Sequence, residues 1–235
     1  MSKIPYILYG RGEIYVNWFL KSFITKLLMK YASMVIAQTE HMKTEMLKYY
    51  QRDIEVIPNG IDVEQFGKVS KIEARKQLGL PLDKKIVIWV GNDRPEKNLQ
   101  RFDNAMILLT IKRKDVLPIA VTNKSYDEVK LYMCAADVLV NTSNSEGFPM
   151  TILEALASGL PIVAPDICGI KEIVDREAIL TDNSSYQIIQ AVESILDTRE
   201  MADNMSFYGK QRAKQFTWQN VVKKLYGDCS EKEDC

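Results

Sequence analysis

The chain has 235 residues, of which 46% are hydrophobic and 26% charged, a composition typical of a globular protein and not of a disordered one. Lys plus Arg and Asp plus Glu number 31 each, so no overall charge favours nucleic acid, and an anionic ligand has to be bound by local groups. No apolar run approaches the roughly 20 residues that span a bilayer, which argues against an integral membrane protein.

The first part of the chain predicts alternating strands and helices. A β-like run from Ile4 to Tyr9 leads through a Gly-Arg-Gly turn to an amphipathic helix from Asn17 to Ala37. Core packing is the simpler role for the apolar face of this helix, and contact with a membrane surface is the alternative. The next predicted elements are a strand at Met34 to Gln38, a helix capped by Thr39 and running through Tyr50, and a strand at Ile54 to Ile57.

A polar stretch from Gly67 to Lys71 marks the predicted domain boundary and gives the regions 1–67, 68–210 and 211–235. After a helix around Ile72 to Leu78, the run Lys85 to Val90 is continuously apolar, as in a parallel strand buried on both faces. The further predicted strands are Leu117 to Val121, Asp137 to Thr142, Pro161 to Ala164 and Ala178 to Leu180. The predicted helices are Tyr126 to Ala135, Met150 to Ser158, one with a capping box at Ser184 to Gln187 that runs to Leu196, and Met201 to Tyr226. This order predicts an α/β fold: one near-complete doubly wound Rossmann-like domain with a parallel sheet, after a partial Rossmann-like domain.

The cysteines and the histidine point to no metal site. Four cysteines, Cys134, Cys168, Cys229 and Cys235, form no CxxC pair, and no signal peptide is recognised, so reduced thiols in a cytoplasmic protein are expected. His41, the only histidine, falls in the first turn of the helix after Thr39. A solvated side chain is the simpler interpretation of this position.

Two loops are candidate binding sites, because ligands of open parallel sheets lie beyond the carboxyl ends of the strands. The first runs from Gly91 to Asn98. Gly91 permits a sharp turn, and Arg94 and Lys97 are long enough to reach phosphate oxygens. The alternative is a solvated helix start, in which Pro95 and the acid after it occupy the first turn.

The second loop runs from Ser143 to Pro149 and precedes a helix whose first position is expected at Pro149. Gly147 allows close backbone approach, and the amides of a helix N-terminus suit the diphosphate of a nucleotide sugar. Glu146 in this loop and Glu154 inside the helix each offer two acceptor oxygens, which match the two donors of a vicinal diol. A solvated glutamate is an equally good explanation for either one alone, and their combination favours a site.

With these residues the sequence resembles the retaining glycosyltransferases of family 4, which have the GT-B fold. The run from Glu146 to Glu154 is similar to the family's E-x7-E signature, and Ala155 to Val163 to the helix and strand after it. Val56 to Asp62 looks like its interdomain linker, Ala135 to Val140 like the strand before the signature, and Phe216 to Trp218 like its closing helix, which returns to the N-terminal domain. The resemblance covers nearly the whole chain.

The resemblance implies a role for each matching position. Glu146, Arg94 and Lys97 would form the catalytic group, with Glu146 on the donor sugar and the two cations on the diphosphate. The donor site would comprise Gly91, Asn92, Arg94, Lys97, Glu146, Gly147, Phe148, Pro149, Met150, Thr151 and Glu154, the last on the ribose hydroxyls. Arg11 and Glu13 are the candidates on the acceptor side. Neither a metal nor a cofactor is implied, and the donor substrate is a nucleoside-diphosphate sugar.

The implied function is transfer of a sugar to a glycan or a lipid-linked acceptor in the cytoplasm, with retention. The resemblance also implies that the start of the acceptor domain is missing. One alternative is therefore a truncated or split chain that binds the donor and needs a partner chain for transfer. Another is a sugar phosphorylase or epimerase of the same fold. An uncovered apolar face on the helix from Asn17 to Ala37 predicts self-association or peripheral contact with the cytoplasmic membrane face.

Overall fold

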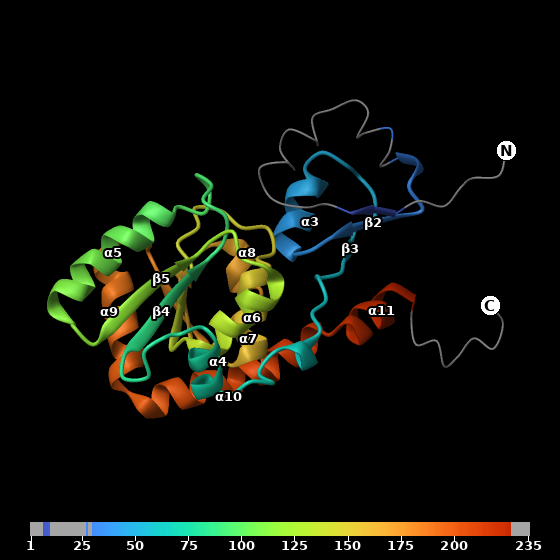
Figure 1. Cartoon of the computed structure of the whole chain (residues 1–235). Helices are drawn as coiled ribbons and strands as arrows, with labels where there is room; N and C mark the ends of the chain where they lie inside the picture. Colours follow the sequence, from blue (N-terminus) through green and yellow to red (C-terminus); the bar gives the residue numbers. More distant parts are fainter. Residues whose placement is uncertain (1–6, 10–26, 28–29, 227–235) are drawn as a thin grey trace.

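The computed structural model describes residues 7–9, 27 and 30–226, and its strands form two parallel sheets (Figure 1). The smaller sheet has the order β1 (Ile7–Tyr9), β2 (Met34–Ala37) and β3 (Glu55–Val56). The helix α3 (Glu40–Leu47) follows β2, and its N-cap Thr39 accepts a hydrogen bond from the Met42 amide. Buried side chains of β2 and α3 pack together, Met42 and Met46 among them.

The larger sheet has the order β5 (Val116–Val121), β4 (Lys85–Val90), β6 (Val138–Val140), β7 (Ile162–Pro165) and β8 (Ala178–Thr181). Every pairing in it is parallel. The helices around it are α4 (Lys71–Gln77), α5 (Leu99–Lys112), α6 (Tyr126–Ala135), α7 (Met150–Ser158), α8 (Cys168–Lys171), α9 (Ser185–Asp197) and α10 (Arg199–Ala213). The strand reversal between β4 and β6 makes this the predicted doubly wound α/β unit.

Helices cover both faces of the larger sheet. Ile86 and Ile88 of β4 face a core shared with α6 and α7, whereas Val87 and Trp89 face a core shared with α5 and α9. Successive side chains of a strand point to opposite faces, so a strand between two helix layers is apolar at every position. The prediction of a strand buried on both faces at Lys85 to Val90 is confirmed.

Two short segments connect the region of the smaller sheet to that of the larger one. The chain leaves β3 through residues 57–62 and returns after α10 through a 3₁₀ turn (Lys214–Phe216) into α11 (Trp218–Tyr226). The segments meet where the Ile61 amide donates to the Phe216 carbonyl at 2.8 Å. Val221 of α11 packs with Ile36 and Ile57 against the smaller sheet.

Two helix predictions need correction. Of the helix expected from Asn17 to Ala37, residues 17–26 and 28–29 lie outside the described residues, and Lys30 and Tyr31 are helical. Met34–Ala37 is a strand, which confirms the overlapping prediction of a strand at Met34 to Gln38 and corrects the end of the helix. Pairing with β1 and β3 overrides the local pattern there. The helix expected from Met201 to Tyr226 is broken at Thr217, which is extended where the two connections meet.

The capping predictions are confirmed in part. Ser184 caps α9 by accepting from the Gln187 amide, but the Gln187 side chain accepts from the Asp182 amide, so the reciprocal half of the box is not made. A complete capping box occurs at Ser125 and Glu128, where α6 begins. The helix at Tyr126 to Ala135 was predicted from its helical period, without this capping box.

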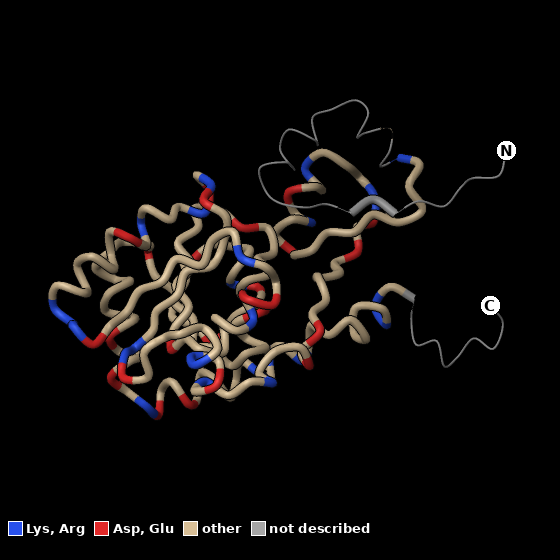
Figure 2. The backbone as a smooth tube through the Cα atoms, in the orientation of Figure 1, with Lys and Arg blue, Asp and Glu red and all other residues tan. Residues whose placement is uncertain are grey.

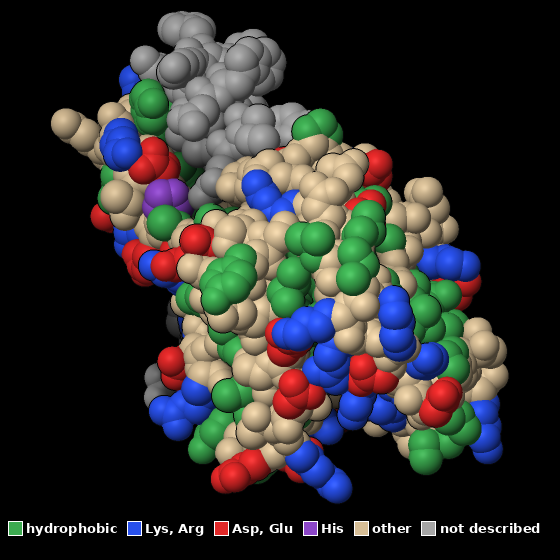
Figure 3. All heavy atoms as spheres, turned by 90° about the vertical axis from the view of Figure 1, so that its left-hand side faces the viewer, with side chains coloured by type: hydrophobic (Ala, Val, Ile, Leu, Met, Phe, Trp, Pro, Cys, Tyr) green, Lys and Arg blue, Asp and Glu red, His purple; other side chains and the backbone are tan. Residues whose placement is uncertain are grey.

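The charged residues are distributed with both signs intermixed (Figure 2). The face that carries the ends of α5 and α9 shows Lys and Arg beside Asp, Glu and hydrophobic side chains (Figure 3). Because the two signs are intermixed, an anionic ligand is met by local groups and not by a field of one sign.

None of the described helices has the length and apolar character that crossing a membrane requires.

Candidate functional site

The loops that follow β4, β6, β7 and β8 meet at the edge of the larger sheet where the strands end. All three non-glycine residues with positive φ in the described part of the chain lie at this edge. Asn98, Asn123 and Asn183 have φ values of 49°, 53° and 68°. Asparagine tolerates this left-handed region, and such conformations gather at functional sites.

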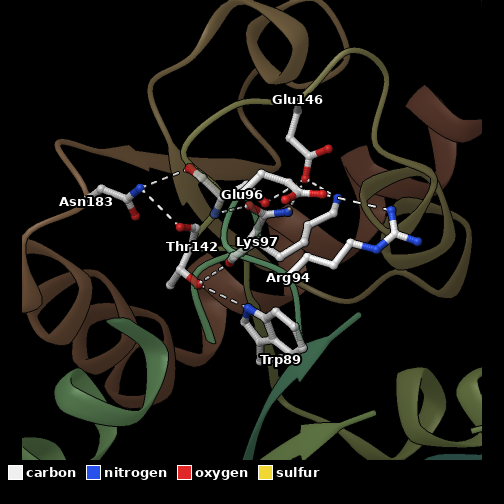
Figure 4. A network of polar contacts seen from close by, with 9 residues as sticks. Trp89, Arg94, Glu96, Lys97, Thr142, Glu146 and Asn183 are labelled. Atoms are coloured by element: carbon white, nitrogen blue, oxygen red, sulfur yellow. Dashed lines mark hydrogen bonds and ion pairs between the residues drawn. The ribbon is translucent and has the colours of Figure 1, made fainter. Parts of the chain in front are cut away.

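Glu146 is at the centre of a polar network on this edge (Figure 4). Its Oε1 accepts from Lys97 Nζ at 2.6 Å, from Ser143 Oγ at 2.6 Å and from Asn141 Nδ2 at 3.3 Å. The Glu146 side chain is only 7% exposed, whereas that of Lys97 is 27% exposed. Among the described residues nothing bonds to Oε2 of Glu146, so this oxygen can accept from a ligand.

A second set of bonds ties the loops together behind this network. Trp89, buried in β4, donates its indole Nε1 to Thr142 Oγ1 at 3.0 Å. The same hydroxyl lies 2.9 Å from the Asn98 carbonyl oxygen, and Asn183 donates to the Ser143 carbonyl at 3.1 Å. The loops after β4, β6 and β8 are thereby fixed relative to one another.

The first predicted loop is divided between the network and the surface. Lys97 joins Glu146, while Arg94 is 60% exposed and its guanidinium lies 3.8 Å from Glu96 (Figure 4). Gly91 is half-buried beside the Trp89 ring, and Asn92 is exposed. The alternative interpretation, a helix with Pro95 in its first turn, is wrong, because α5 begins at Leu99 after the cap Asn98.

The second predicted loop leads into α7 as expected, with one difference. Pro149 is the N-cap and not the first helical residue, since its ψ is 112°. It makes no side-chain cap bond, so the first amides of α7, those of Met150 and Thr151, have no side-chain acceptor. Phe148 is buried and packs edge-on against Phe216 at 5.9 Å between ring centroids. Gly147 is half-buried at the turn.

Glu154, one turn into α7, is 8% exposed and has no hydrogen-bond partner among the described residues. Burial raises the pKa of its carboxyl to about 7. Its neighbour Tyr126 also has a raised pKa, first because of burial and then because of the Glu154 charge. A buried carboxylate without a partner costs free energy unless a ligand supplies donors, so Glu154 is a strong candidate for ligand binding.

Sequence reasoning missed Gly169 in α8, which follows β7. A Cβ atom on this residue would lie 2.1 Å from the Glu146 carbonyl oxygen and 2.7 Å from that of Gly147. Helix α8 therefore packs directly against the loop that holds Glu146. The contact joins Gly169 to Glu146, 23 positions earlier, so the neighbouring residues in the sequence do not predict it. Asn141, Ser143 and Trp89 were likewise assigned no role, although they lie beside predicted residues.

Replacing Gly169 with alanine is expected to lower the free energy of unfolding by about 1–3 kcal/mol, because the backbone atoms it would meet cannot rotate away. Urea unfolding measures this change. Gly209→Ala in α10 is the matched control: its Cβ would meet Leu156 atoms no closer than 3.5 Å, and we expect no loss of stability. Equal stability of the two variants would contradict the close packing of α8.

A cavity of about 610 Å³ lies at the opposite edge of the sheet, beside the starts of β4, β6 and β7. Its lining includes Lys85, Asp137, Pro161 and Lys210. The C-termini of α6, α7 and α9 point to this edge, and their partial negative charge disfavours a diphosphate. We therefore assign the candidate site to the loop edge. Arg11 and Glu13 lie outside the described residues.

Comparison with known proteins gives two family matches. The family described as glycosyl transferases group 1 matches residues 119–212, which include the Glu146 loop, α7 and Gly169. The family described as Glycosyltransferase Family 4 matches residues 2–65. The first match includes β6, β7 and β8 of the larger sheet, and the second includes the smaller sheet; β4 and the loop after it lie outside both.

Individual relatives agree with these matches. A Bacillus subtilis protein named as a teichuronic acid biosynthesis glycosyltransferase, TuaC, is 28% identical over 213 residues, which cover 81% of this chain and 55% of that protein. D-inositol 3-phosphate glycosyltransferase of an Arthrobacter species is 26% identical over 226 residues, with 81% and 54% covered. The chain thus spans about half the length of these relatives.

Solved structures share the fold. Anabaena HepE in complex with UDP superposes with a TM-score of 0.79 at 19% identity, covering 94% of this chain and 71% of that one. Sucrose-phosphate synthase of Thermosynechococcus elongatus gives 0.75 at 21% identity, covering 93% and 65%. At these identities the likeness concerns the arrangement of strands and helices.

Proposed function

This chain belongs to the family 4 glycosyltransferases of the GT-B fold, and on that premise we propose that it moves a sugar from a nucleoside-diphosphate sugar to a glycan or a lipid-linked acceptor. The observation that carries the proposal is a pair of buried acids at one sheet edge. Glu146 is held by Lys97 and Ser143, and Glu154 has no partner among the described residues.

The donor would lie across the loops after β4 and β6. Lys97 uses one of its three N–H donors on Glu146 and is 27% exposed, so it can also meet a phosphate oxygen. The first amides of α7 lack a side-chain cap and would add donors to the diphosphate. Arg94, exposed in the same loop, can turn toward the diphosphate by rotation of its side chain.

The two acids would hold the sugar and the ribose. Oε2 of Glu146 would accept from a hydroxyl of the donor sugar, since Oε1 is occupied by protein donors. Glu154 would accept from the two ribose hydroxyls, which supply the donors that its buried carboxylate lacks. Ligand binding would then favour the ionised form of Glu154, whose pKa burial raises to about 7.

Transfer would proceed with retention and without a metal. The bond between the anomeric carbon and the diphosphate breaks, and the acceptor hydroxyl bonds to the same face of that carbon. The departing diphosphate takes the proton that the acceptor loses. Lys97 and the α7 amides stabilise the negative charge that develops on the diphosphate, which is the main electrostatic demand of the step.

The free thiols of Cys134 and Cys168 support a cytoplasmic setting.

A second candidate function is donor binding without transfer by this chain alone. Its support is that the chain spans about half the length of its relatives, while the donor-side loops are all among the described residues. A partner chain would then complete the acceptor side. Nucleotide binding together with the absence of transfer or of donor hydrolysis would favour this alternative.

The test is calorimetric titration of the purified chain with UDP, GDP and ADP sugars. We expect one base to be preferred, and we expect Lys97→Ala and Glu154→Ala each to weaken its binding at least about tenfold. Lys112→Ala is the matched control, because Lys112 forms its ion pair with Glu193 on the surface of the helix layer. If neither variant weakens binding, the assigned site is wrong.

A further inference from the structure

The N-terminus of α3 receives a carboxylate from a distant part of the chain. Glu172, the residue after α8, accepts from the Glu40 amide at 2.6 Å and from the His41 amide at 2.9 Å. Thr39 accepts from the next amide, that of Met42. The side chain that satisfies the first turn of α3 thus comes from 131–132 residues further along the chain.

This contact joins the smaller sheet to the donor side. Helix α3 packs on β2 of the smaller sheet, whereas α8 follows β7 of the larger one. Figure 1 shows α8 next to α3, apart from the connection that runs from β3 toward α11. A carboxylate at a helix N-terminus is favoured by hydrogen bonding and by the helix dipole.

The backbone of Glu172 is held firmly. Arg212 of α10 donates to the Glu172 carbonyl at 2.9 Å and to the Ile173 carbonyl at 2.7 Å. The Arg212 guanidinium also lies 5.2 Å from the centroid of the Phe216 ring, which packs against Phe148 of the donor loop. Arg212 thus holds the backbone from which the Glu172 carboxylate reaches α3, and it is linked through Phe216 to Phe148 of the donor loop.

The other end of α8 is in contact with that site. Gly169 lies so close to the carbonyl oxygens of Glu146 and Gly147 that no side chain fits between them. Glu172 is three positions after Gly169 in the chain. A shift of the Glu146 loop on donor binding would therefore move α8, and with it the carboxylate that holds α3.

We propose that Glu172 is a positioning residue that docks the acceptor-side unit, through the N-terminus of α3, beside the occupied donor loop. The proposal rests on the proposed function, because transfer requires an acceptor hydroxyl to be brought to the sugar held at Glu146. Glu172 touches neither substrate. It acts through α3, and α8 transmits the state of the donor loop to it.

Amide hydrogen exchange on the full chain tests the docking contact. Without nucleotide, Glu172→Ala is expected to speed exchange of the Glu40 and His41 amides about tenfold, while Met42, bonded to Thr39, changes little. Glu172→Gln keeps one acceptor oxygen and should fall between. Glu45→Ala, elsewhere on α3, is the control and should leave both amides at the wild-type rate. Wild-type rates in Glu172→Ala would overturn the docking role.

Addition of UDP tests the coupling. In the wild type UDP is expected to slow exchange of the Glu40 and His41 amides, and in Glu172→Ala it should bind with an unchanged dissociation constant and leave these amides unaffected. A contact that is merely structural would show no response to UDP in either protein. UDP binding without a change at α3 would overturn the coupling. If none of UDP, GDP and ADP binds, the proposed function fails, whereas the comparison without nucleotide still decides the docking contact.

Discussion

Replacing Glu146 with alanine is expected to lower the free energy of unfolding by about 2–4 kcal/mol, because it removes one partner of a largely buried ion pair. Lys97 would lose its carboxylate, and the buried Ser143 hydroxyl and Asn141 amide would lose the same acceptor. Urea unfolding measures the loss. The isosteric Glu146→Gln should lose less stability and still lower the rate of transfer about 100-fold or more, since it weakens the hold on the sugar and on Lys97.

The chain offers a matched control for this prediction. Glu193 pairs with Lys112 at 2.8 Å, and the Lys112 side chain is 69% exposed. Glu193→Ala should therefore lower the free energy of unfolding by less than about 1 kcal/mol, because solvent screens an exposed pair. Equal losses for Glu146→Ala and Glu193→Ala would show that the Glu146 network contributes no special stability.

Glu154 is expected to make stability depend on pH. Burial raises its pKa from 4.5 to about 7 in the folded chain, so the folded state binds its proton more tightly than the unfolded state does. The free energy of unfolding should then fall as pH rises from about 4.5 to about 7, by about 3 kcal/mol in total. Glu154→Gln removes this contribution, so its advantage over the wild type should grow across this range. Parallel urea-unfolding profiles for the two proteins would contradict the raised pKa.

The same carboxyl should govern nucleotide affinity. If the ionised form accepts from the ribose hydroxyls, wild-type affinity for the preferred nucleoside diphosphate should rise with pH until about pH 7. Glu154→Gln serves as the control for the nucleotide's own titration, and subtraction of its profile isolates the contribution of Glu154. Identical pH profiles in the two proteins would remove Glu154 from the ribose site without affecting the assignment of Lys97.

Local patterns were sufficient for most of the larger sheet. The continuously apolar run at Lys85–Val90 and the helical periods at Tyr126–Ala135 and Met150–Ser158 are found with the predicted bounds. A strand buried on both faces has a continuous run of apolar residues, and an amphipathic helix has apolar residues that repeat about every 3.6 positions, so both can be recognised from consecutive residues. The order of these elements then located the loop edge, because ligand loops of a doubly wound sheet follow the strands.

The two failed helix predictions share one cause, which is pairing between distant segments. The strand predicted at Met34 to Gln38 is confirmed, and the helix predicted to continue to Ala37 fails because Met34–Ala37 pairs with β1 and β3. The last helical stretch breaks at Thr217 because Ile61 bonds to the backbone there. Neither contact can be read from the residues next to it in sequence.

For the site, the sequence by itself determined that the segments carrying Lys97, Glu146 and Glu154 follow strands of one parallel sheet, while their contact with a ligand stays a prediction. Only the tertiary structure decided that Lys97 bonds to Glu146 while Arg94 remains at the surface, that Glu154 is buried without a partner among the described residues, and that Glu172 reaches α3. The physical reason is that chain order fixes the edge at which a loop emerges, whereas hydrogen bonds and burial depend on side chains that the packed sheet brings together from 49 to 132 residues apart.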